Sequence, residues 1–333
     1  MVRGSHPMTT PDFDADIANW QRERSQDPTA AEQSIAGARR HSLAVNARAR
    51  ALREDAPRPA RTSELPARVT DSSGADRLVP ARLFQPAGTG PTATVVYFHG
   101  GGWVFGDMDT HTQHVERLCV EAGVNVVSVD YRRAPEHSFP AAFDDCLAVT
   151  RWVAGQQAEL GGDGRLVVAG DSAGAQIAAS VAIACRSDGP ALSAQLLIAP
   201  VTDTAGCYAD PELNSRYPSR IERGTGFGLT TAGMAAFCGY YGLDPLAPDW
   251  RASPMQADDH SGLPAAVVHV GGFDPLRDEV IAYAQTLERA GVPVRLRVWP
   301  TLNHGYFALG GVSRQADLAA ACASQDLVEI LLR

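Results

Sequence analysis

The chain has 333 residues, 45% hydrophobic and 20% charged, a balance ordinary for a globular protein and enough length for one large α/β domain with an insertion. The formal net charge of −9 and the lack of a basic cluster argue against nucleic acid and anionic membrane surfaces as partners. All basic residues other than histidine are arginines, which excludes Ser–Lys catalysis and lysine Schiff bases.

The N-terminal region predicts helices that need a partner surface. Residues 1–7 have the composition of an expression tag, with Met8 as the expected natural start. From about Pro11 to Ala56 the chain is polar and alanine-rich, and its few apolar residues have helical spacing, so this segment must pack on another part of the molecule. No stretch reaches transmembrane length and no signal-peptide core is present, so we expect a cytoplasmic protein without membrane insertion.

Strands and helices then alternate. Two extended runs, Ala67–Thr70 and Arg77–Phe84, come first. Strands are predicted at Thr94–Phe98, Val124–Val129, Arg165–Ala169, Ala194–Ala199, Ala265–Val270 and Val294–Trp299. Helices are predicted at His111–Ala122, Ala141–Gly155, Ala173–Arg186, Arg277–Ala290 and Arg314–Leu331. Continuous apolar strands alternating with helices predict an α/β fold with a mostly parallel central sheet that helices cover on both faces.

One long segment breaks this alternation. Residues 202–262 are rich in Gly, Pro, Tyr and Phe, with one weak helical pattern at Thr230–Tyr241. An insertion of this length in a compact sheet is more typical of a lid than of a structureless loop. We therefore expect residues 8–60 and 202–262 to form a helical cap over a core made of residues 61–201 and 263–333.

A serine follows one of the predicted strands. Gly170-Asp171-Ser172-Ala173-Gly174 stands between the strand Arg165–Ala169 and a helix. This is the nucleophile-elbow pattern, in which glycines permit a sharp turn that exposes the serine hydroxyl. It predicts acyl transfer through a serine ester.

The base and the acid are expected beyond later strands, because active sites of parallel sheets lie at the carboxyl ends of the strands. His304 follows the strand Val294–Trp299, and Asp274 follows the strand Ala265–Val270. Asp278 is the alternative acid, although it and Glu279 fall in a first helical turn, where acids mostly serve the helix dipole. The order Ser172, Asp274, His304 is the one expected of an α/β-hydrolase. Among the other histidines, we expect His269 in the core and both His41 and His260 in solvent.

A glycine run completes the predicted site. His99-Gly100-Gly101-Gly102-Trp103 follows the strand Thr94–Phe98, and its glycines free backbone N–H groups to point inward. Together with the N–H of Ala173 they would stabilise an oxyanion. A phosphate loop is the alternative, but that motif requires a lysine.

The chain resembles the hormone-sensitive lipase family of α/β-hydrolases, the bacterial family IV esterases. The matching segments are His99–Trp103 with Gly106-Asp107, Asp130–His137, Phe139–Ala142 with Asp144, Gly170–Gly174, Pro200 with Asp203, Ser253-Pro254, Asp274–Glu279 and His304-Gly305. The resemblance implies Ser172 as nucleophile, Asp274 as acid and His304 as base. It also implies an oxyanion hole of the Gly101, Gly102 and Ala173 amides, and a helical cap.

The resemblance also assigns supporting roles. Tyr131 and Glu136 are expected to brace the loops behind the site, and His99 to hold the glycine loop. The chain departs from the family at Ala175 and Gln176, at Arg133 where leucine is usual, and at Tyr306 where phenylalanine is common. These departures leave substrate preference open.

A serine carboxylesterase for short- to medium-chain acyl esters is the expected function, with no metal or other cofactor. The expected pocket walls are Trp20, Trp103, Phe105, Phe227, Tyr240 and Tyr241. An amidase, a lactonase or a metabolite-specific deacetylase on the same triad is an alternative, and a non-catalytic ligand receptor is a more distant one. The resemblance implies a homodimer through the last strand and the last helix, for which Ala316–Leu332 is apolar enough. Cys207 and Cys238 flank the same insertion and are the candidate pair for a disulfide.

Overall fold

The computed structural model describes residues 12–25, 34–53, 56–70, 74, 76–88 and 90–332. The segment expected to be a tag, 1–7, lies outside the described residues. The described strands are β1 Arg61–Glu64, β2 Ala67–Thr70, β3 Asp76–Val79, β4 Ala81–Gln85, β5 Thr92–Phe98, β6 Asn125–Val129, β7 Gly162–Asp171, β8 Ala194–Ile198, β9 Ala265–Phe273 and β10 Val294–Asn303.

Eight of these strands form one sheet, in the order β1-β4-β6-β5-β7-β8-β9-β10. The six strands from β6 to β10 in this order pair in parallel, and β1 and β4 add two antiparallel pairings at one edge. The predicted mostly parallel sheet is confirmed. The sequence did not predict β1. It also joined β3 and β4 into one run, which the structure breaks at Pro80, a residue without a backbone N–H.

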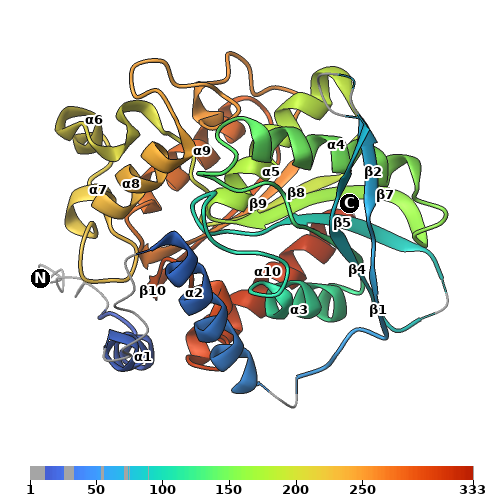
Figure 1. The fold of residues 1–333 in the computed structure, drawn as a ribbon, viewed down its shortest axis with the longest axis horizontal. Coiled ribbons are helices and arrows are strands. Elements are labelled where there is room, and N and C mark those ends of the chain that lie inside the picture. The colour runs from blue at the N-terminus through green and yellow to red at the C-terminus, as the bar shows by residue number, and fades with distance from the viewer. Residues whose placement is uncertain are drawn as a thin grey trace, which may run out of the picture.

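Helices cover the sheet on both faces (Figure 1). The longer ones are α1 Ala15–Ser25, α2 Ile35–Ala51, α3 Thr112–Ala122, α4 Ala141–Gly155, α5 Ala173–Asp188, α8 Thr231–Tyr241, α9 Arg277–Arg289 and α10 Arg314–Leu331. Between β8 and β9 there are also two short helices, α6 Pro211–Ser215 and α7 Ser219–Glu222, and two 3-10 turns, Ala205–Tyr208 and Pro254–Gln256. The insertion therefore holds more helix than the single weak pattern predicted.

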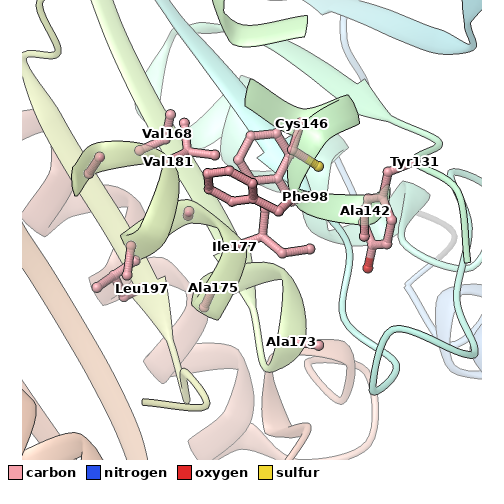
Figure 2. Packing of buried hydrophobic residues seen from close by; sticks show 14 of the residues in the cluster. Phe98, Tyr131, Ala142, Cys146, Val168, Ala173, Ala175, Ile177, Val181 and Leu197 are labelled. Atoms are coloured by element: carbon pink, nitrogen blue, oxygen red, sulfur yellow. The ribbon is translucent and has the colours of Figure 1, made fainter. Parts of the chain in front are cut away.

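Alternating side chains of each central strand enter two separate cores. On β5, Val96 and Phe98 pack with residues of α4, α5 and α9, whereas Val95 and Tyr97 pack with residues of α3 and α10. Figure 2 shows Phe98 of the first core beside Cys146 of α4 and Ile177 of α5. Burial on both faces explains why the strands appear in the sequence as continuous apolar runs.

Four of the parallel strands end immediately before a residue of the predicted site. His99 follows β5, Ser172 follows β7, Asp274 follows β9 and His304 follows β10. Because parallel strands share one carboxyl edge, these residues meet there. The helices α1, α2, α6, α7 and α8 gather at the same end of the molecule, on the left in Figure 1. Within the described residues, no helix is long and apolar enough to cross a membrane.

Candidate active site

Ser172 occupies a strained turn between β7 and α5. Its φ of 54° and ψ of −121° lie where side-chain-bearing residues are rare. The glycines on either side are required, since a Cβ on Gly170 or Gly174 would come within 2.5 or 2.0 Å of the Phe98 carbonyl oxygen. The Ser172 N–H donates to the carbonyl of Ile198 at 2.8 Å, which fixes the turn against β8. The hydroxyl is thereby held clear of the backbone.

The structure brings Ser172, His304 and Asp274 together in one hydrogen-bonded line. His304 Nε2 lies 2.9 Å from Ser172 Oγ, and His304 Nδ1 lies 2.8 Å from Asp274 Oδ2. The Asp274 carboxylate is fully buried, and its other oxygen accepts the Leu276 N–H at 2.8 Å. Burial by itself would lower the pKa of His304, but the charge and hydrogen bond of Asp274 outweigh it and hold that pKa above its usual value.

The alternative acid, Asp278, is engaged elsewhere. It accepts the Ser219 N–H at 2.7 Å and forms an ion pair with Arg277. Glu279 does not merely serve the helix dipole, as its position in the sequence had indicated. It is fully buried and pairs with Arg220, with the Arg220 Nη2 to Glu279 Oε2 distance at 2.6 Å. The sequence shows only that Glu279 stands in the first turn of a helix. It does not show that residues of the insertion cover this acid.

The glycine loop after β5 presents free backbone donors beside the serine. None of the N–H groups of Gly101, Gly102 and Ala173 donates a hydrogen bond to another described residue. Gly101 and Gly102 have φ of 117° and 59°, which glycine adopts readily. The loop is closed by the Phe105 N–H, which donates to Gly101 O at 2.8 Å. Such unpaired donors suit an oxyanion.

Side chains behind the loop hold it in place. The Tyr131 hydroxyl donates to His99 O at 2.6 Å, and the two rings stack with centroids 4.1 Å apart. Burial lowers the pKa of His99 to about 3, so its ring stays neutral. Glu136 pairs with Arg39 of α2 at 2.8 Å, and the same guanidinium donates to Val104 O. Glu136 thus joins the loop to an N-terminal helix.

Two of the departures from the family pattern also support this region. Gln176 Oε1 accepts the Trp103 indole N–H at 2.9 Å, and its amide nitrogen donates to Arg251 O at 2.7 Å. This links the glycine loop, α5 and the insertion. Arg133 donates to the carbonyl of Gly106, in the turn that follows the glycine loop.

Asp171, directly before the nucleophile, anchors a network that the sequence did not predict. It accepts the Tyr97 hydroxyl at 2.7 Å and the Gly100 N–H at 3.1 Å, and it lies 3.3 Å from His111 Nε2. Burial would raise the pKa of Asp171, but His111 and Tyr97 hold it below its usual value. The only signal in the sequence was an acid inside the elbow motif.

His111, His114 and Asp171 could also offer a metal three ligands. Their donor atoms lie within 4.8 Å of one another, and two imidazoles with a carboxylate are a set that binds Zn²⁺. His111 and Asp171 already serve the hydrogen bonds described above, whereas His114 Nδ1 is buried without a partner among the described residues. The expectation that no metal is needed stays a prediction.

A cavity of about 470 Å³ opens onto Ser172 and His304. Of the aromatic walls expected from the sequence, Trp20 of α1 and Phe105 line it. The walls that were not expected come mainly from α2 and the insertion: Ala38, His41, Ser42, Val45, Asn46, Ala49, Leu229, Met234 and Phe237. Met234 and Phe237 are three positions apart on α8, a spacing that could have indicated one helix face.

The other four expected walls lie elsewhere, which corrects the prediction. Trp103 and Tyr241 are buried and stack on each other with centroids 4.8 Å apart. Phe227 packs against Phe273, and Tyr240 is 46% exposed. Tyr240 and Tyr241 are consecutive on α8, so one side chain enters the protein while its neighbour faces solvent.

The remaining histidines divide differently from the prediction. His269 is buried and lies 3.0 Å from Asp326, which confirms a core histidine. His260 is buried rather than solvated, with Nε2 2.8 Å from Pro254 O, and His41 lines the cavity. All six cysteines are free thiols, so Cys207 and Cys238 form no disulfide in this structure.

The chain is similar to named hydrolases over most of its length. Residues 95–308 match the model of a family described by the alpha/beta hydrolase fold. The chain is 44% identical to esterase LipI of Mycobacterium tuberculosis over 66% of this chain and 67% of that protein. It is 35% identical to ethyl acetate hydrolase of Pseudomonas putida over 83% and 87% of the two chains.

A solved structure extends the similarity to the whole fold. The hyperthermophilic esterase from the archaeon Pyrobaculum calidifontis is 30% identical, with a TM-score of 0.84 over 97% of this chain and 100% of that one. These matches agree with the motifs that first indicated the relationship. The chain therefore belongs to the hormone-sensitive lipase family within the α/β-hydrolase fold.

Proposed function

We propose that this protein is a serine carboxylesterase that hydrolyses short- to medium-chain acyl esters through an acyl-enzyme. The observation that carries the proposal is the hydrogen-bonded line from Ser172 through His304 to Asp274, beside three unpaired N–H groups. The named activities of the relatives, esterase and ethyl acetate hydrolase, point to the same reaction.

In this mechanism Ser172 Oγ attacks the ester carbonyl carbon while His304 Nε2 takes its proton. Asp274 keeps the imidazole in the Nδ1–H tautomer and stabilises the imidazolium. The oxyanion accepts hydrogen bonds from the N–H groups of Gly101, Gly102 and Ala173. Collapse of the intermediate expels the alcohol, which takes its proton from His304. A water molecule then gives its proton to His304 and attacks the acyl carbon, which releases the acid and regenerates the serine.

The chain-length preference follows from the enclosure of the site. Residues of α1, α2 and α8 line the cavity, which supports the proposal that residues 8–60 and 202–262 form a cap on a core of residues 61–201 and 263–333. A cavity of about 470 Å³ is of the size that suits a small ester, which supports a preference for short- to medium-chain acyl groups. The relatives' names favour ester hydrolysis over the amidase, lactonase, deacetylase and receptor alternatives.

We also propose a homodimer through the exposed edge of the sheet. Within the described part of the chain, β10 pairs with β9 alone, and α10 lies beside it. An open edge strand is a ready template for pairing with a second copy.

Hydrolysis of p-nitrophenyl acetate, butyrate, octanoate and palmitate by the wild type, Ser172→Ala and Ser187→Ala tests the esterase. We expect rapid turnover of the short esters and little of palmitate. Ser172→Ala should lower kcat by a factor on the order of 10⁴ or more. Ser187, exposed near the end of the same helix, is the matched control and should be neutral. Equal, slow rates for wild type and Ser172→Ala would refute the proposal, and a matched anilide would then test the amidase.

A further inference from the structure

Arg24 places a positive charge on the wall of the active-site cavity. It stands near the end of α1, is half-buried, and lines the same cavity as Ser172. Its Nε is buried without a hydrogen-bond partner, and Arg24 has no salt bridge to any carboxylate in the described part of the chain. Burial lowers the pKa of the guanidinium, and no carboxylate of the described residues opposes this effect. The charge is therefore partly desolvated, and no acid of the described residues pairs with it.

A second unpaired donor lies one helical turn earlier. The indole Nε1 of Trp20 is buried and has no acceptor among the described residues. Positions 20 and 24 share a face of α1, and both residues line the cavity. Arg48, which lies over the Trp20 ring, is instead paired with Glu23 at 2.9 Å. The Arg24 Nε and Trp20 Nε1 donors on the cavity wall thus lack acceptors among the described residues. Arg48, which does not line the cavity, has Glu23 as its acceptor.

No acid among the described residues of the cavity wall pairs with Arg24. The titratable residues that line it are Arg24, His41, His111, His114, Asp171 and His304. Asp171 is the single carboxylate among them, and its oxygens are occupied by Tyr97, Gly100 and His111. The other titratable residues of this wall are one arginine and four histidines, none of which carries a negative charge. The wall therefore complements a negative ligand.

The geometry points to an anion subsite at Arg24 and Trp20, which selects esters that carry a carboxylate or phosphate group away from the scissile bond. This inference rests on the proposed esterase function and names the substrate class of the same site. A bound anion would accept charge-assisted hydrogen bonds from the guanidinium and give the indole N–H an acceptor. A plain acetyl ester would leave both donors unpaired.

Matched esters test the subsite in the acyl position. The mono-p-nitrophenyl ester of adipic acid is compared with p-nitrophenyl hexanoate, which has the same chain length without the charge. The p-nitrophenyl ester of 5-phosphonopentanoic acid distinguishes a phosphate-type anion from a carboxylate. For the alcohol position, 4-acetoxybenzoate is compared with its methyl ester. The quantity measured is the ratio of kcat/KM for the anionic ester to that for its neutral partner.

We expect Arg24→Gln to lower at least one of these ratios by about 10- to 100-fold, the effect of losing a charged hydrogen bond. Arg24→Lys should retain part of the selectivity. Arg22→Gln, on the exposed side of the same helix, is the matched control and should leave all ratios as in the wild type. Ratios that Arg24→Gln leaves unchanged, or that Arg22→Gln lowers equally, would overturn the subsite.

A binding measurement separates this inference from the esterase proposal. The adipate ester is titrated calorimetrically into Ser172→Ala with and without Arg24→Gln. Weaker binding on loss of Arg24 would support the subsite even if the wild type hydrolysed no ester, a result that would refute only the proposed function. Equal binding by the two variants would refute the subsite even in an active esterase.

Discussion

His304 is held from both sides, and each contact has a separate effect on its chemistry. Its Nε2 lies 2.9 Å from the Ser172 hydroxyl, and its Nδ1 lies 2.8 Å from a fully buried carboxylate. The Asp274 charge favours the imidazolium and so raises the pKa of His304 despite its burial. The base must be neutral to accept the serine proton, so this raised pKa limits activity in acid.

Activity should therefore begin to fall at a comparatively high pH on the acid side of the pH–rate profile. As the pH falls through the raised pKa of His304, kcat/KM for p-nitrophenyl butyrate should drop about tenfold per pH unit. We expect the midpoint above 6.5, the ordinary histidine value. Asp274→Asn should move the midpoint down and lower kcat by a factor on the order of 10⁴. Asp278→Asn, the matched control, should keep the profile, and a midpoint below 6.5 in the wild type would contradict this account.

The sequence predicted some site residues and missed others for a physical reason. Ser172, Asp274 and His304 stand directly after strands, so their meeting follows from the parallel sheet. Arg24 and His111 reach the site through the packing of helices, which local patterns do not encode. The prediction of aromatic cavity walls was partly wrong for the same reason. Composition indicated Tyr240 and Tyr241 as aromatic residues of the insertion, but it did not show which way either side chain would face.

At the scale of elements, the elbow depends on two backbones in close contact. A Cβ on Gly174 would lie 2.0 Å from the Phe98 carbonyl oxygen, where β5 and the start of α5 meet. Backbone atoms cannot yield as the end of a flexible side chain can. By contrast, Gly239 of α8 has nothing within 4 Å of a Cβ position and is exposed.

Opposite outcomes are thus expected from one type of substitution. Gly174→Ala should lower the free energy of unfolding by about 3 kcal/mol or more and abolish esterase activity, because the elbow must shift. Gly239→Ala should raise the free energy of unfolding by about 0.5–1 kcal/mol, because alanine is favoured over glycine in a helix by this amount. Urea unfolding followed by circular dichroism measures both. A stable and active Gly174→Ala would show that the elbow tolerates rearrangement.

The fold was predictable where strands are buried on both faces and less so at the edges. β5 to β9 appear as apolar runs because both faces are covered, whereas the edge strand β10 is mostly half-buried or exposed. The structure extends β9 to Phe273 and β10 to Asn303, past the predicted ends. β1 is mostly exposed, so it carries no apolar signal. The insertion was predicted as a lid without α6 and α7, which have five and four residues and are too short to show a helical period.

Across the whole molecule, two Arg–Glu pairs join the covering segments to the core. Glu279 of α9 accepts from Arg220 of α7, and it also accepts the Thr202 N–H at 2.8 Å and the Tyr208 hydroxyl. Arg39 of α2 pairs with Glu136 in the loop after β6. The first pair is fully buried, whereas the Glu136 side chain is 55% exposed. The two Arg–Glu pairs should therefore contribute differently to the free energy of unfolding.

Glu279→Gln should lower the free energy of unfolding by about 3–5 kcal/mol, because it leaves the Arg220 guanidinium buried without a counter-charge. Glu136→Gln removes a similar pair in solvent and should cost only about 0–1 kcal/mol. Urea unfolding of both variants at equal ionic strength makes the comparison. Similar losses for the two variants would mean that burial does not set the strength of these pairs.

The proposed dimer is the prediction that involves the largest surface. The edge strand β10 has its arginines bound by α10, since Arg295 and Arg297 both contact Asp326, so they do not repel a second copy. Val298 on β10 and Leu318 on α10 are 40% and 50% exposed. Sedimentation equilibrium should give twice the mass of the chain for the wild type, and the mass of one chain for the double variant Val298→Lys, Leu318→Lys. Leu246→Lys, which adds a charge at a 92% exposed leucine in the insertion, is the control and should stay dimeric. A wild-type protein that sediments as a single chain would refute the dimer, and dissociation by Leu246→Lys as well would show that charge rather than the β10 edge decides the assembly.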